Sequence, residues 1–100
     1  MNTAKKGRVR HLVFKEDDTW YGVALEFNIV EEGDDPDVVF ANLQEAIRGY
    51  VEAQRKLKGT RYAPLNQTPV KEYEDLWNKV QANKAIPSPY QVSSAGYSLV

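Results

Sequence analysis

The alternation of apolar and polar side chains near the start of the chain predicts an antiparallel hairpin. Residues 9–15 and 20–27 each have the period-two pattern of a strand, and the polar run 16–19 between them is a turn. In the second strand, three apolar residues are expected to share one face: Val23, Leu25 and Phe27. Asn28 is a suitable turn residue, and residues 29–32 are expected to form a short third strand that ends at Gly33.

The clearest local pattern predicts an amphipathic helix over residues 36–57. Asp35 is a good N-cap, and Pro36 stands at the first helical position, where proline is favoured. Apolar residues then recur at helical spacing: Val39, Phe40, Leu43, Ala46, Ile47, Tyr50 and Val51. Basic residues in the last turn and Gly59 behind them favour an end of the helix near Leu57.

The second half of the chain predicts a shorter helix and a last strand. Residues 71–83 are expected to be helical, with apolar residues on one side: Tyr73, Leu76, Trp77 and Val80. Ile86–Pro89 contains two prolines and fits neither a regular helix nor a central strand. Residues 90–100 are expected to contain a last strand, most clearly at 96–100.

Together these elements predict a single α+β domain over residues 1–100, in which an antiparallel sheet of three or four strands packs on the long helix. Residues 1–7 are expected to be a flexible N-terminus, 58–85 an insertion that holds the short helix, and 86–100 a proline-rich segment with the last strand. The predicted core consists of Val23, Leu25, Phe27, Phe40, Leu43, Ile47 and Tyr50. The short helix or a second subunit must cover the other face of the sheet, and the sequence leaves this choice open.

The composition narrows the classes of function. The chain has no cysteine, which excludes a disulfide framework and a thiolate metal site and fits a cytoplasmic location. Its net charge is −1, whereas proteins whose main ligand is nucleic acid are usually strongly basic. No apolar run is long enough for a membrane span, and no apolar segment follows the basic start, so neither a span nor a secretory signal is expected.

Five carboxylates gather just before the long helix: Glu31, Glu32, Asp34, Asp35 and Asp37. They could attract a basic partner, bind a cation, or form only a solvated turn with a capped helix start. The solvated turn is the favoured interpretation, because three of the five already have that local role. A cation is the least favoured, because the spacing is not that of an EF-hand and no histidine is near. We therefore expect no metal and no cofactor, and we take these five residues as the candidate partner-binding set.

His11 is the only histidine in the chain. A catalytic histidine needs a nucleophile or base arranged around it, and its place in the middle of a strand favours a structural role. The sequence contains no glycine-rich phosphate loop, no nucleophile elbow and no pair of metal ligands at helical spacing. We therefore predict no catalytic residues and no enzymatic activity; a small enzyme that depends on His11 is the least favoured alternative.

The stretch Trp20–Tyr50 resembles the HicB-like antitoxin family, whose members have a helix start of the form G-D-T/S-P-E-E-A followed by L-x-N-x-x-E-A-I. The residues that match the helix start are Gly33, Asp34 and Pro36, and those that match the helix are Asn42, Glu45, Ala46 and Ile47. Asp35 replaces the usual Thr or Ser, and Val38 replaces a glutamate, which removes the reciprocal capping box. Ile86–Pro89 resembles the I-P-x-P segment that precedes the final strand in many members.

The resemblance implies a bacterial, cytoplasmic antitoxin that sequesters a HicA-like toxin, a small basic ribonuclease with a double-stranded-RNA-binding-like fold and a catalytic histidine. It also implies a homodimer, to which free sheet edges would contribute. Because residue 100 follows directly on the expected last strand, we expect neither a C-terminal helix-turn-helix or ribbon-helix-helix unit nor operator DNA binding. The alternative is an orphan HicB-like dimeric scaffold or adaptor that has no toxin.

Overall fold

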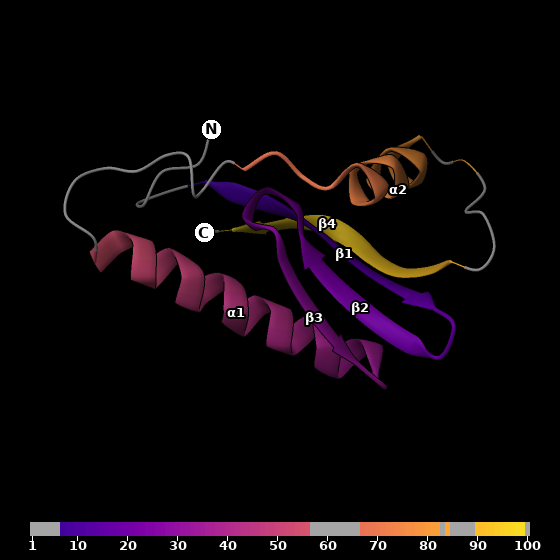
Figure 1. The fold of residues 1–100 in the computed structure, drawn as a ribbon, viewed down its shortest axis with the longest axis horizontal. Helices are drawn as coiled ribbons and strands as arrows, with labels where there is room; N and C mark the ends of the chain where they lie inside the picture. Colours follow the sequence, from indigo (N-terminus) through magenta and orange to yellow (C-terminus); the bar gives the residue numbers. More distant parts are fainter. Residues whose placement is uncertain (1–6, 57–66, 83, 85–89, 100) are drawn as a thin grey trace.

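The computed structural model describes residues 7–56, 67–82, 84 and 90–99. Within these ranges the element order is β-β-β-α-α-β, with a short 3-10 turn after the second strand (Figure 1). The predicted α+β class is therefore confirmed. Most of the predicted flexible N-terminus, the first part of the insertion and the proline-rich segment 86–89 lie outside the described residues.

The four strands form one antiparallel sheet in the order β3-β2-β1-β4. Their bounds are Arg8–Glu16 for β1, Thr19–Ala24 for β2, Ile29–Gly33 for β3 and Gln91–Leu99 for β4. In Figure 1 helix α1 lies along one face of the sheet and helix α2 lies on the opposite face. Because β1 is an inner strand between two helical layers, side chains on both of its faces are buried, among them Val9, Leu12, Val13 and Phe14.

The second strand is shorter than predicted. The expected strand 20–27 ends at Ala24, and Leu25–Phe27 form the 3-10 turn η1. Asn28 then adopts the left-handed conformation (φ 53°) and donates its backbone N–H to the Leu25 carbonyl, which turns the chain into β3. The predicted common face of the strand is wrong for this reason: the turn breaks the period of two, so Leu25 and Phe27 pack on opposite sides of the sheet.

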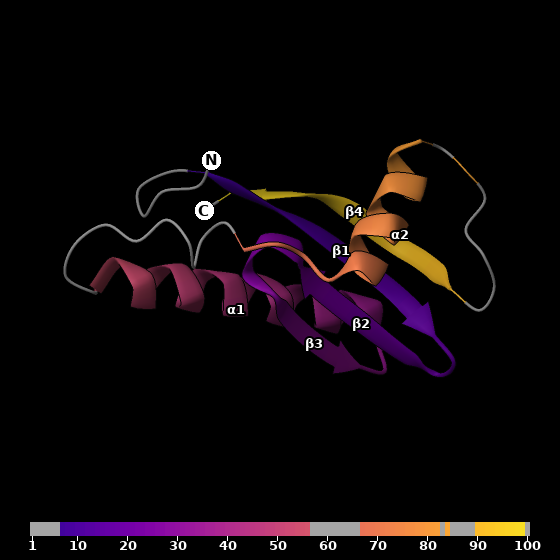
Figure 2. The same ribbon diagram turned by 45° about the horizontal axis from the view of Figure 1, so that its top comes forward.

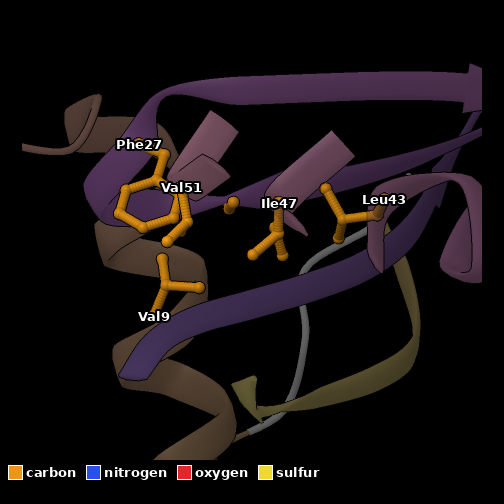
Figure 3. Close-up of a cluster of buried hydrophobic side chains, with 6 residues drawn as sticks. Val9, Phe27, Leu43, Ile47 and Val51 are labelled. Carbon is orange, nitrogen blue, oxygen red and sulfur yellow. The ribbon is translucent and has the colours of Figure 1, made fainter. Parts of the chain in front are cut away.

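Helix α1 (Pro36–Lys56) begins where the sequence predicted, and Leu57 lies outside the described residues. The Asp35 carboxylate caps it, because Oδ1 accepts the backbone N–H of Asp37 at 2.8 Å. The apolar stripe of α1 packs on the sheet in a cluster that Figure 3 shows: Val9, Ala24, Phe27, Leu43, Ile47 and Val51. Two predicted core residues are less buried than expected. Tyr50 is half-buried, and Phe40 is 36% exposed because it lies on the flank of the stripe.

Helix α2 (Lys71–Gln81) covers the other face of the sheet, as the turned view in Figure 2 also shows. It is shorter than the predicted 71–83, since Ala82 forms its C-cap. The second buried cluster joins it to the sheet: Leu12, Phe14, Val23, Leu25, Leu76 and Trp77. The sequence left open whether the short helix or a second subunit covers this face, and the structure shows that the short helix docks on its own sheet.

Arg10 of β1 fastens α2 to the sheet. Its guanidinium makes two bonds to the Glu74 carboxylate of α2, at 2.6 and 2.8 Å, and its Nε bonds to Glu26 at 2.6 Å. The guanidinium also lies 5.6 Å from the centre of the Trp77 ring. The hydrogen bonds to Glu74, and then those to Glu26, raise the pKa of Arg10 although burial opposes this. Arg10, to which the sequence analysis assigned no role, thus positions helix α2 on the sheet.

The last strand is longer than its clearest predicted part, 96–100, and extends from Gln91 to Leu99. Its six residues from Ser94 to Leu99 pair with Arg8–Val13 without a break in register. The register then shifts, so that Phe14 faces Val92 and Ser93 has no partner. This irregularity is a β-bulge, which bends the strand at one point and leaves the rest of it regular.

Two glycine substitutions should have opposite effects on stability. Gly22 is buried, and a Cβ added there would lie 2.9 Å from Cγ1 of Val39. Gly49 is an exposed residue of α1, and a Cβ added there would meet no atom within 4 Å. We expect Gly22→Ala to lower the free energy of unfolding by about 1–3 kcal/mol through overpacking. Gly49→Ala should raise it by about 0.5–1 kcal/mol through helix propensity. Urea denaturation of both variants tests this, and an equal effect of the two would contradict the packing of α1 on β2.

Removing the Arg10 guanidinium should loosen α2. In Arg10→Met two partly buried carboxylates lose their partner, with side chains 20% and 32% exposed. We expect the free energy of unfolding to fall by about 1–2 kcal/mol. This is less than for a fully buried pair, because water screens the exposed carboxylate oxygens. Hydrogen exchange should rise first in α2. The control is Arg48→Met, which breaks a pair whose arginine is 65% exposed and should change stability by less than about 0.5 kcal/mol.

Candidate functional site

The five predicted carboxylates lie together where β3 ends and α1 begins, and we call this group the acidic corner: Glu31, Glu32, Asp34, Asp35 and Asp37. Four of them are exposed and Glu31 is half-buried. The turn between the two elements is tight, because Gly33 packs so close to α1 that an added Cβ would lie 3.1 Å from the Val39 side chain. The fold therefore holds the five carboxylates close together, at the end of β3, on the short connection and in the first turn of α1.

The acidic corner differs from most other acidic positions in having no cationic partner. Within the described ranges, none of its five carboxylates makes an ion pair. Elsewhere Glu26 and Glu74 bind Arg10, and three further acidic residues pair with a basic residue on their own helix: Glu45, Glu52 and Asp75. Within the described ranges the negative charge of the acidic corner is thus not neutralised by ion pairs, and its field extends into solvent over about one Debye length.

The fold adds carboxylates that the sequence analysis did not connect with the acidic corner. Trp20 of β2 pairs with Gly33 of β3, and Glu16 pairs with Thr19 across the β1–β2 turn. The turn residues Asp17 and Asp18 therefore lie at the same end of the sheet as the acidic corner, with Lys15 as the basic residue beside them. This proximity follows from the pairing of the strands. Once β2 pairs with β1 from Thr19 onward and with β3 up to Gly33, the β1–β2 turn must lie beside the end of β3.

The five carboxylates do not have equal roles. Asp35 caps α1, and Asp37 stands in the first turn of the helix, where a negative charge is favourable. Glu32 and Asp34 are exposed, and neither takes part in a helix cap, so they are the residues best placed to meet a partner. Among the residues that the structure describes, no group of three or more carboxylate, histidine or cysteine side chains could hold a metal ion.

A second polar group lies beneath α1, around His11. The ring nitrogens of His11 contact two hydroxyls of β4, Nδ1 with Ser98 Oγ at 2.9 Å and Nε2 with Ser94 Oγ at 3.2 Å. Gln44 of α1 donates to the same Ser98 hydroxyl at 2.9 Å, and the Phe40 ring meets the imidazole edge-on at 5.2 Å. The histidine is only 7% exposed, and its burial lowers the pKa of the imidazole. These bonds join β1, β4 and α1, which is a structural role.

The surroundings of His11 lack parts that nucleophilic catalysis uses. No described carboxylate bonds to either ring nitrogen, so no acid orients the imidazole. Ser94 does reach the surface, in a depression of about 210 Å³ under Phe40 and beside the start of α1. The depression has Asp37 on its rim, whose negative charge would oppose a developing oxyanion. The bonds that the structure does show give the His11 group a packing role, because they connect β1 with β4 and, through Ser98, with Gln44 of α1.

The buried imidazole should make stability depend on pH. In the unfolded chain His11 binds a proton near its ordinary pKa of 6.5, whereas burial lowers the pKa of the ring in the folded chain, which therefore binds this proton only at a lower pH. The resulting stabilisation is fully present above about pH 6.5 and is lost as the pH falls through the lowered pKa of the folded state. Urea denaturation between pH 7 and 5 should show this fall. His11→Gln should remove most of it, and an unchanged slope would contradict the assignment.

Comparison with known proteins adds no functional information. No family model, no curated protein and no solved structure matches the chain. No helix in the described ranges combines the length and the apolar character that a membrane crossing requires. The resemblance to HicB-like antitoxins thus stays a prediction from short sequence motifs, and any function has to be argued from the acidic corner and the fold that presents it.

Proposed function

We propose that this protein is a binding module that captures a small basic protein at the acidic corner, and that the partner is a HicA-like ribonuclease toxin. The observation that carries the proposal is the negative charge of the acidic corner. Five carboxylates, four of them exposed, make no ion pair among the described residues, and those of the β1–β2 turn lie at the same end of the sheet. Such a surface attracts a basic protein and speeds its association.

The arrangement of layers also favours a partner at the rim of the sheet rather than on a face. Helix α1 occupies one face, and α2 occupies much of the other. A partner therefore meets edges, turns and helix ends before it meets the core. The acidic corner combines all three, because it contains the end of edge strand β3, the turn at Gly33 and the start of α1.

The identity of the partner rests on the sequence resemblance. A ribonuclease must carry positive charge where it binds RNA phosphates, so an acidic module that covers this surface would compete directly with the substrate. The motifs that suggest the HicB-like family include Asp34, which belongs to the acidic corner, and Gly33 and Pro36, which lie at the end of β3 and the start of α1. The proposed activity is inhibition by occlusion, which needs no catalytic group on this chain.

Co-expression with the protein encoded by the neighbouring reading frame tests the proposal. We expect a complex that survives co-purification and relieves the growth defect that the neighbour alone causes. The double reversal Glu32→Lys and Asp34→Lys should weaken binding by about tenfold or more and reduce its salt dependence, because it replaces steering charge with repulsion. Neither residue caps α1, so the fold should survive, which circular dichroism can verify.

The matched control is Glu45→Lys with Glu52→Lys, which makes the same change of charge on exposed positions of α1. This control should leave affinity nearly unchanged. Equal weakening by both double variants would show that only net charge matters and would remove the acidic corner as the site. If the neighbour is not toxic and forms no complex, the antitoxin proposal fails. The orphan dimeric scaffold then becomes the better description.

A further inference from the structure

We propose that the edge strand β4 pairs antiparallel with β4 of a second copy of this chain, across a two-fold axis perpendicular to the sheet. The pairing would join two four-stranded sheets into one continuous sheet. It concerns the opposite edge from the acidic corner, because the strand order is β3-β2-β1-β4. The inference does not depend on the proposed function, and either can fail without the other.

The first argument is the exposed hydrogen-bonding edge. Strand β4 is nine residues long, and among the described residues it pairs with β1 alone. The backbone groups on its outer side therefore meet solvent or another strand. Proteins usually block such an edge with charged side chains or proline. The segment QVSSAGYSL contains neither, so nothing in its sequence opposes the approach of a second strand.

The second argument is the contrast with the other edge, which explains why the partner is a copy of this chain and why it meets β4. Strand β3 has two glutamates among its five residues, Glu31 and Glu32. Two copies that paired through β3 would bring these charges close together, which is unfavourable. Two copies that paired through β4 would face each other with the uncharged side chains of the strand itself, among them hydroxyls, small residues and one tyrosine.

The third argument is the apolar surface on both sides of the β4 edge. Tyr97 lies on the α2 side and is 52% exposed, and Phe40 lies on the α1 side and is 36% exposed beside Ser93 and Ser94. Exposed aromatic residues at such positions are typical interface anchors. Tyr97 is also held in place by two neighbours. The Arg8 guanidinium carbon lies 4.4 Å from the centre of its ring, and the centre of the Trp77 ring lies 5.5 Å from it. A preorganised side chain loses little entropy on binding.

The bulge and the symmetry together locate the axis. The bulge at Ser93 interrupts β4, so regular pairing is confined to the six residues from Ser94 to Leu99. In an antiparallel pair, residues that stand directly opposite each other have their side chains on the same face of the sheet. Side chains alternate between the two faces along a strand. Two identical strands related by a two-fold axis perpendicular to the sheet can therefore match faces only if the axis passes at a residue, which then stands opposite its own copy. The middle of the regular stretch is at Gly96 and Tyr97. Both α1 helices then lie on one side, and both acidic corners stay free at the outer ends.

Sedimentation velocity of the full chain over a range of concentrations tests the proposal. The wild type should be a dimer that dissociates on dilution. Tyr97→Glu removes the anchor and places like charges near the axis, and it should raise the dimer dissociation constant by about tenfold or more. Val30→Glu is the matched control. Val30 is 45% exposed on edge strand β3 and pairs with Val23, a residue of the α2-side cluster, so it faces the same side of the sheet.

Hydrogen exchange of the wild type provides a second measurement that needs no substitution. Amides of residues 94–99 should become more protected as concentration rises, whereas those of β3 should not change. A wild type that is monomeric at every concentration would overturn the proposal. A dimer that Val30→Glu dissociates and Tyr97→Glu does not would overturn it as well, because the interface would then lie at the opposite edge.

Discussion

The need to cover both faces of an inner strand governs this structure. Strand β1 has neighbours on both sides, so it can stay dry only if a helix lies on each face of the sheet. Helix α1 provides one layer through its long apolar stripe. Helix α2 is short and joined to the sheet by few residues, and it provides the other layer because Leu76 and Trp77 enter the second cluster. Two polar residues of β1, Arg10 and His11, are hydrogen-bonded between the same two layers.

Two polar residues of β1 show how this is done. Arg10 points toward α2, where two carboxylates neutralise it, and His11 points toward α1, where two hydroxyls and an aromatic ring enclose it. Each is expensive to bury alone and favourable once bonded. They specify which helix lies on which face, since an exchange of the layers would place a guanidinium under Phe40 and an imidazole against Glu74. Polar contacts here set orientation, while apolar burial provides most of the stability.

With both faces occupied, the two edges become the available surfaces, and they differ in chemistry. The β3 edge ends in an acidic corner without ion pairs among the described residues, which suits a basic partner. Strand β4 itself contains no charged residue, and Tyr97 and Phe40 are exposed on its two sides, which suits self-association. The two proposed partners would occupy opposite edges of the sheet and would therefore not compete with each other.

The sequence by itself determined the local elements. The start of α1 at Pro36, the turn at Asn28 and the short third strand follow from residues that are adjacent in the chain, so capping and turn chemistry predict them. The tertiary structure decided which elements meet. Phe40 lies on the flank of the apolar stripe and stays 36% exposed, and α2 docks on its own sheet, where Arg10 bonds to Glu74. Both outcomes depend on contacts between residues far apart in the chain, which periodicity does not encode. Phe27 is a different case, because a local 3-10 turn that the sequence analysis did not predict moved it to the other side of the sheet.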